Sequence, residues 1–148
     1  MNILEIFINS ILLIITLDNE LWDIILLSLF VSFTALIIAS LLGFIVGYYF
    51  AIYNFYFKKI ILIIINSLMG IPPVVVGLIV YFIFASGGPL GILQLLYTPS
   101  AMIIAQTIII FPIIASLSHE IFSKNWFEFK DQIRSLNIPF WGSVKLLF

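Results

Sequence analysis

The stretch from Ile60 to Ser118 carries no Asp, Glu, Lys or Arg, and this absence restricts the possible folds more than any other feature of the sequence. A soluble domain needs charged side chains to face water, and roughly a quarter of its residues are charged. In this chain 9% of the residues are charged and 64% are hydrophobic. The stretch is interrupted at three places, at Pro72-Pro73, Gly87-Gly88-Pro89 and Pro112. The sequence therefore predicts an all-α polytopic membrane protein.

Three segments are long and apolar enough to be transmembrane helices, because about 20 helical residues cross the hydrocarbon core of a bilayer. We expect these helices at residues 22–50, 60–86 and 100–117, the second interrupted by prolines and the third near the minimum length. Residues 1–17 form a shorter apolar segment that contains Glu5. This composition favours a helix lying along the outer surface, with a short tilted span as the alternative. We expect residues 1–148 to form a single membrane domain without a signal peptide, since no Lys or Arg precedes the first apolar run.

The distribution of charge predicts the orientation of the spans. Basic residues occur in two groups, Lys58-Lys59 and then Lys124, Lys130, Arg134 and Lys145. Acidic residues without a basic neighbour cluster at Asp18, Glu20 and Asp23. The positive-inside rule places both basic groups in the cytoplasm. The chain then crosses the membrane twice between them, which leaves the connector 87–99 outside and residues 119–148 in the cytoplasm.

Small residues recur at helical spacing along the first expected span. The set is Ser28, Ser32, Ala35, Ala39, Gly43 and Gly47. A face of small side chains lets another helix approach closely. The other helix can belong to the same chain, as in ordinary helix packing, or to a moving partner subunit.

The prolines predict helix breaks within the membrane. Pro72 and Pro73 lack amide hydrogens, so we expect the carbonyls of Leu68 and Met69 to lose their usual helical donors. For the same reason we expect the Ile108 carbonyl to lose its donor at Pro112. Broken helices at mid-membrane are typical of transporters. An ordinary proline kink with local repair would leave the same sequence pattern.

Several functional classes lack the residues that they need. No ionisable group lies within the second and third spans, which argues against a proton-coupled carrier, and the single histidine, His119, lies at the cytoplasmic edge. There is no Cys, no His cluster for a metal and no Ser/His/Asp set, so we expect neither an enzyme nor a cofactor. The net charge of -1 gives no attraction to nucleic acid. The sequence also lacks a G-x-x-x-x-G-K-[ST] loop, so ATP-driven transport would need another chain to bind the nucleotide.

Four sequence blocks carry a family resemblance. Along the chain they are SLFVS at residues 28–32, PPVVVGL at 72–78, GPLG at 88–91 and LLYTPSAMIIAQ at 95–106. In this order they resemble the permease subunits of ATP-binding-cassette (ABC) oxyanion importers, above all tungstate permeases and next molybdate permeases. The resemblance covers roughly residues 22–117 and implies a partial ABC-importer permease fold.

The resemblance also implies a cytoplasmic coupling helix with the pattern E-A-A-x-x-x-G. The nearest match here is DQIRSLN, in which Asp131 keeps the acid, while Asn137 stands where the family has Gly. The expected contacts to the ATPase are Asp131, Gln132, Arg134, Leu136, Asn137 and Trp141. Independently of the family, the aromatic residues of this segment could dock into a groove on a soluble partner or rest on lipid headgroups.

The function implied by the resemblance is a membrane-spanning permease that imports an oxyanion, with tungstate first and molybdate or sulfate as alternatives. The implied partners are a separate ABC ATPase, an extracytoplasmic oxyanion-binding protein, membrane lipid and, at full length, a second copy in a homodimer, in the plasma membrane of a prokaryote. Candidate residues of the translocation path or helix breaks are Ser67, Pro72, Pro73, Gly77, Thr98, Ser100, Gln106, Thr107 and Pro112. Because the sequence ends at Phe148 within the coupling loop, we expect a truncated permease or a fragment that does not transport alone. The rival interpretation is a non-transporting membrane protein or an inactive permease remnant.

Overall fold

The computed structural model describes residues 12, 19–135 and 142, with no side chains described at 129–134. The elements are α2 (Asn19–Ile52), α3 (Lys58–Leu68), α4 (Pro73–Phe84), the short 3-10 helix η1 (Gly91–Leu93) and α5 (Pro99–Ser135). No strand occurs among these residues, so the all-α prediction is confirmed.

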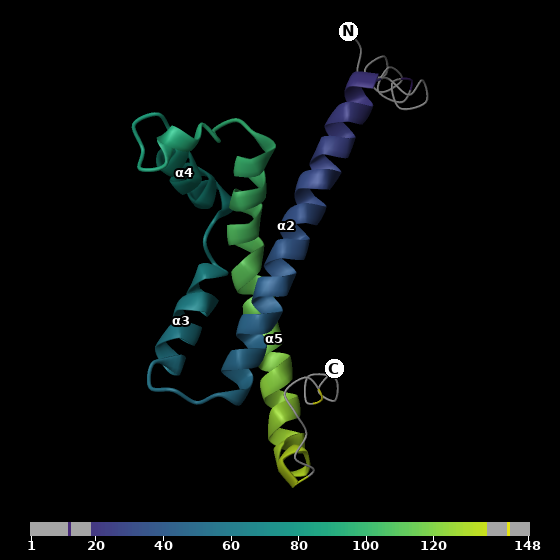
Figure 1. The fold of residues 1–148 in the computed structure, drawn as a ribbon, viewed down its shortest axis with the longest axis vertical. Coiled ribbons are helices and arrows are strands. Elements are labelled where there is room, and N and C mark those ends of the chain that lie inside the picture. Colours follow the sequence, from purple (N-terminus) through teal and green to yellow (C-terminus); the bar gives the residue numbers. More distant parts are fainter. Residues whose placement is uncertain (1–11, 13–18, 136–141, 143–148) are drawn as a thin grey trace, which may run out of the picture.

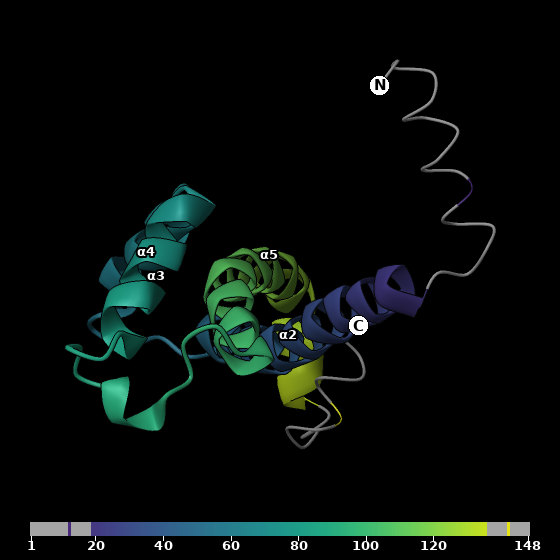
Figure 2. The ribbon, with the colours of Figure 1, turned by 90° about the horizontal axis from the view of Figure 1, so that it is seen from above.

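The long helices α2 and α5 form the spine of the molecule. Both run in the same direction, and α2 leans away from α5 toward its Asn19 end (Figure 1). Seen from above, α5 lies between α2 on one side and α3 and α4 on the other (Figure 2). Both long helices are apolar enough to cross a membrane, α2 with 34 residues and α5 with 30 residues from Pro99 to Glu128. At 1.5 Å per residue each exceeds the roughly 30 Å of bilayer hydrocarbon.

The small-residue face of α2 packs against α5 of the same chain. Ala35, Ala39, Gly43 and Gly47 are buried, and α5 is the element that α2 packs against. A Cβ added at Gly43 would lie 2.8 Å from the Ile114 Cγ2, so these helices approach too closely for any larger residue there. Ser28 and Ser32 at the other end of this face are exposed. Intrachain packing therefore accounts for the buried part of the face.

The second expected span is two short helices with a sharp bend between them. α3 and α4 are each apolar, and their axes differ by 102° across the break at residues 69–72. The expectation placed one proline-interrupted span at residues 60–86, and the structure has helices at Lys58–Leu68 and Pro73–Phe84. The bend fits either a broken span or a re-entrant loop.

The two ends of this helix pair lie at different heights along α5. Lys58, at the start of α3, is close enough to His119 of α5 to interact with it electrostatically. The chain then reaches Pro99, which begins α5 and lies 20 residues before His119, or about 30 Å along a helix. α3, α4 and the following connection therefore climb the thickness of a bilayer, and α5 returns across it. This path places Lys58 and the segment after His119 at the same end of the molecule.

Glycines shape the connection between α4 and α5. A Cβ added at Gly88 would meet the Phe82 carbonyl oxygen, and one at Gly91 would meet the Ala85 carbonyl oxygen. The amide of Leu90 donates to the Ile83 carbonyl at 3.0 Å, which folds the segment back onto the end of α4. The chain can make this tight return because these two positions carry no side chain.

Helix α5 continues well past the expected end of the third span at Leu117. It runs to Ser135, because after Pro112 the sequence contains no Gly or Pro until Pro139. The polar shift at His119 thus marks a change of environment within one helix. Beyond it, Phe122 packs edge-on against Tyr48 at 5.4 Å, and Trp126 packs against the same cluster.

Candidate functional site

The two prolines at the break begin a new helix. Pro72 is the N-cap of α4 with φ -59° and ψ 136°, and Pro73 is its first helical residue, a position where a missing amide hydrogen costs nothing. Before the break, the amide of Ile71 donates to the Leu68 carbonyl at 3.2 Å. Pro72 has no amide hydrogen, so the usual helical bond to this carbonyl is absent, and the turn bond from Ile71 replaces it.

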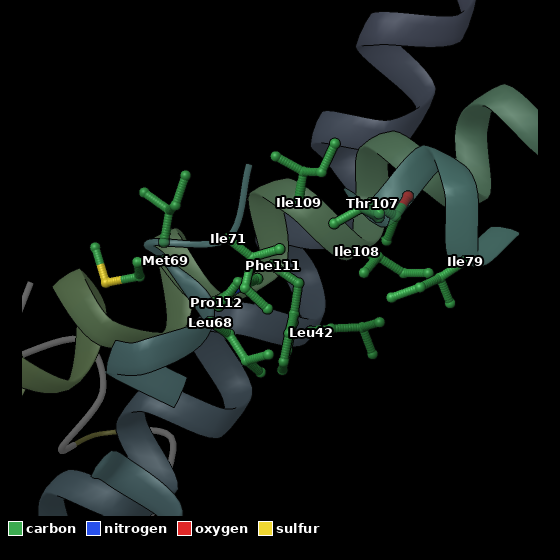
Figure 3. Close-up of a pocket in the computed structure, with 12 residues that line it drawn as sticks. Leu42, Leu68, Met69, Ile71, Ile79, Thr107, Ile108, Ile109, Phe111 and Pro112 are labelled. Carbon is green, nitrogen blue, oxygen red and sulfur yellow. The ribbon is translucent and has the colours of Figure 1, made fainter. Parts of the chain in front are cut away.

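Pro112 lies beside this break, within α5. Its side chain is fully buried, and the helix continues on both sides of it. A cavity of about 400 Å³ lies between the break, α4 and the proline (Figure 3). Its lining is formed by Leu42, Leu68, Met69, Ile71, Val76, Ile79, Thr107, Ile108, Ile109, Phe111, Pro112 and Ile113. The side chains in this lining are apolar except for that of Thr107, so the cavity offers no strong hold on an anion.

Three of the hydroxyl groups proposed for the path donate to carbonyl oxygens of their own segments. Ser67 Oγ donates to the Ile63 carbonyl at 2.8 Å, and Thr107 Oγ1 to the Ile103 carbonyl at 2.7 Å. Thr98 Oγ1 likewise donates to the Leu95 carbonyl at 2.6 Å. In this conformation these protons are committed to the backbone. A passing anion could take them only if the hydroxyl groups rotated.

Other candidates lie in different environments. Gln106 has a buried side-chain carbonyl oxygen, Oε1, without a hydrogen-bond partner. Gly77 is exposed on α4, and an added Cβ there would meet nothing within 4 Å. Ser100 is exposed at the start of α5, 12 residues or about 18 Å along the helix from Pro112.

The structure therefore gathers only part of the predicted set. Ser67, Pro72, Thr107 and Pro112 lie at or beside the break. Thr98 and Ser100 lie at the start of α5, away from the break.

One interhelical contact was not singled out from the sequence. Ser116 Oγ donates to Asn66 Oδ1 at 2.6 Å and so joins α5 to α3. Ser116 follows Pro112 by one helical turn, and Asn66 precedes the break. Both are polar residues in apolar helices near prolines, which is the signal that could have identified them. The bond holds α3 beside the proline of α5.

The expected coupling segment is only partly described. Asp131, Gln132 and Arg134 lie in the last turns of α5, and their side chains are not described. Leu136, Asn137 and Trp141 lie outside the described residues. No group of three or more His, Asp or Glu side chains that could hold a metal occurs in the described part of the chain.

Three curated relatives match the chain. It is 43% identical over 113 residues to the tungstate uptake system permease protein TupB of Peptoclostridium acidaminophilum, which covers 76% of this chain and 49% of that protein. It is 41% identical over 91 residues to a probable anion ABC transporter permease protein of Haloferax volcanii, covering 62% of this chain and 39% of the relative. A TupB protein of Campylobacter jejuni is 40% identical over 65 residues, which cover 44% of this chain and 27% of that protein.

The matched region spans about half or less of each relative's length. No family model matches the chain, and no solved structure matches it. The relatives and the two long apolar helices together identify a multi-pass protein of a prokaryotic plasma membrane.

Proposed function

We propose that this chain, a homologue of ABC transporter permease subunits, forms part of the membrane pathway of an importer for an oxyanion, with tungstate as the first candidate. The observation that carries the proposal is the 43% identity over 113 residues to a tungstate uptake permease. Residues 22–117, which carry the family resemblance, include both sides of the cavity beside Pro112.

The proposed energy source is a separate ATPase. The chain has no phosphate-binding loop of its own, so nucleotide binding would fall to a partner that contacts the cytoplasmic end of α5. Asp131, Gln132 and Arg134 lie in that end, and the motif continues through Leu136, Asn137 and Trp141. Because α5 is one continuous helix from Pro99 to Ser135, a displacement at its cytoplasmic end can reach the cavity around Pro112.

The proposed mechanism is alternating access with weak contacts to the ion. An extracytoplasmic binding protein would deliver the oxyanion, and closure of the ATPases would switch the pathway between outward-open and inward-open states. Hydrogen bonds to charged groups contribute about 1.5–3 kcal/mol each, so a lining rich in Lys or Arg would release a divalent anion slowly. A lining without Lys or Arg avoids such retention, and hydroxyl groups such as those of Ser67 and Thr107 would act as weak donors that ease passage.

The complete pathway would need more polypeptide than these spans. The matched region is about half of the first relative, and the proposal includes a homodimer in which two permeases enclose the path. The Haloferax volcanii relative is named only for an anion, which keeps molybdate and sulfate as alternative substrates.

Uptake by the intact transport system tests the proposal. Cells that express this chain within an intact permease, together with an ABC ATPase and an oxyanion-binding protein, should accumulate tungstate, and deletion of the region that encodes this chain should abolish accumulation. Competition with excess molybdate or sulfate ranks the three ions. Unchanged tungstate uptake after the deletion would favour a non-transporting protein.

Association with the ATPase tests the coupling segment. Asp131→Ala and Trp141→Ala in the full-length permease should abolish co-purification of the ATPase without reducing membrane insertion. Glu120→Ala removes an acid about three turns earlier in the same helix and serves as the control. Retention of the ATPase by both coupling variants would remove the coupling assignment and leave the substrate proposal standing.

A further inference from the structure

Residues 48–59, which we name the aromatic-basic turn, comprise the end of α2, the connection at residues 53–57 and the first two residues of α3. The segment combines two kinds of side chain. Its aromatic residues are Tyr48, Tyr49, Phe50, Tyr53, Phe55, Tyr56 and Phe57, and Lys58-Lys59 follow directly. Tyr48 is buried against Phe122, whereas Tyr56 is 91% exposed and Phe57 58% exposed. The turn therefore presents aromatic rings outward next to two cations.

The outer rings of the turn pack on one another. The ring centroids of Tyr49 and Tyr53 are 4.8 Å apart, and those of Phe50 and Phe55 are 5.4 Å apart. Tyr49 also lies 6.2 Å from Phe55, which closes the cluster across the turn. Aromatic rings, above all those of tyrosine, are stabilised at the membrane–water interface, where the ring contacts apolar lipid and the hydroxyl group contacts water.

Positive charge at the start of α3 lies beside these rings. The Lys58 ammonium donates to Asn54 Oδ1 at 3.2 Å, which fixes it at the start of α3. It also interacts electrostatically with the imidazole of His119 on α5, whose Nε2 lies 3.2 Å from Ser123 Oγ. Glu120 is the acid that acts on the same imidazole, and the first turn of α3 contains no acidic residue. Lys58 and Lys59 are thus not neutralised within their own helix.

The turn lies where α2 ends and α3 begins, at one end of the apolar helices (Figure 1). A loop at the end of membrane-crossing helices lies at headgroup depth, where clustered basic residues attract anionic lipids.

We propose that the aromatic-basic turn binds the phosphate of an anionic phospholipid through Lys58 and Lys59, while its exposed tyrosines lie at the glycerol level of the same leaflet. Charge complementarity selects an anionic headgroup over a zwitterionic one. The ring cluster favours a lipid over a free phosphate ion, because a soluble ion makes no use of apolar rings. The proposal is independent of what the protein transports.

Native mass spectrometry of the purified chain in detergent tests the proposal. The chain is titrated with dioleoyl phosphatidylglycerol and, separately, with dioleoyl phosphatidylcholine, which has the same acyl chains. Lys58→Gln and Lys59→Gln each remove one charge from the turn, and Lys58→Arg keeps it. Lys124→Gln is the matched control, since Lys124 is an exposed cation farther along α5. Circular dichroism confirms that each variant keeps its helical content.

We expect phosphatidylglycerol to bind more tightly than phosphatidylcholine, and each Gln substitution in the turn to weaken its binding about fivefold. Lys58→Arg and Lys124→Gln should bind it as the unmodified chain does. Equal binding of the two lipids would overturn the proposal. An equal loss in Lys124→Gln would do the same, because it would show diffuse attraction to charge. Adding inorganic phosphate at the lipid concentration should not displace the lipid, and displacement would mean that the turn binds a free ion.

Discussion

Gly47 of α2 and Ser118 of α5 approach so closely that a Cβ built on the glycine would lie 2.5 Å from the Ser118 Cβ. The same added atom would lie 2.8 Å from the His119 amide nitrogen, so the obstacle includes backbone, which cannot rotate away. The contact holds the more polar part of α5, which begins near His119, against α2. It therefore fixes where His119 lies relative to Lys58.

Substitution of Gly47 by Ala should separate the two helices. Overpacking of a close contact costs about 1–3 kcal/mol, so we expect a lower free energy of unfolding by that amount in detergent titrations. Gly77→Ala is the control, because an added Cβ there has open space and alanine favours helix by about 1 kcal/mol. Equal stability of Gly47→Ala and the unmodified chain would contradict the close packing of α2 on α5.

The Asn66–Ser116 hydrogen bond should give a measurable coupling energy. In a double-mutant cycle with Asn66→Ala and Ser116→Ala, we expect a coupling near 0.6 kcal/mol, the typical value for hydrogen bonds between membrane helices. The measurement is the free energy of unfolding of the two single variants and the double variant. Strict additivity would mean that the 2.6 Å contact does not hold α3 to α5.

The neighbours Gln106 and Thr107 should respond differently to loss of their polar atoms. Gln106→Met removes a buried carbonyl oxygen that has no partner, so we expect the unfolding free energy to rise by about 1 kcal/mol. Thr107→Val removes a hydroxyl that already donates to the Ile103 carbonyl, so we expect a loss of about 0.6 kcal/mol.

Tungstate uptake by the intact transporter carrying Gln106→Met then shows whether this side chain affects only stability or also passage of the ion. A Gln106→Met permease that is more stable but imports tungstate more slowly would place Gln106 on the path. If uptake is unchanged, the side chain has no role in passage.

Single cysteines should report the predicted orientation, since the chain has none of its own. Tyr56→Cys and Phe127→Cys should react with a membrane-impermeant maleimide from the same side of the membrane, and Ile92→Cys from the other. All three side chains are at least 77% exposed, so accessibility depends on the side of the membrane. Labelling of positions 56 and 127 from opposite sides would overturn the two-crossing topology between Lys58 and His119.

Much of the architecture can be predicted from the order of residues. The charge-free stretch requires a membrane environment, because only backbone satisfied within helices is stable in lipid. The small residues of α2 predicted a close helix contact, and Ala35, Ala39, Gly43 and Gly47 are buried. The sequence left open which helix approaches this face. The answer is α5 of the same chain, because the loop lengths and the break at residues 69–72 bring a helix that begins at Pro99 alongside α2.

The prolines show most clearly where sequence reasoning reached its limit. Pro72 and Pro73 determined that a helix must stop near residue 70, since a proline cannot donate the bond that continues it. They did not determine that the next helix turns by 102°, that Ile71 satisfies the Leu68 carbonyl, or that the break faces Pro112 across a cavity. Composition and periodicity are local properties of the chain and so determined the membrane class and the helices. The direction after the break and the meeting of Asn66 with Ser116 were decided by packing between segments 50 residues apart, because such contacts depend on how whole helices fit together.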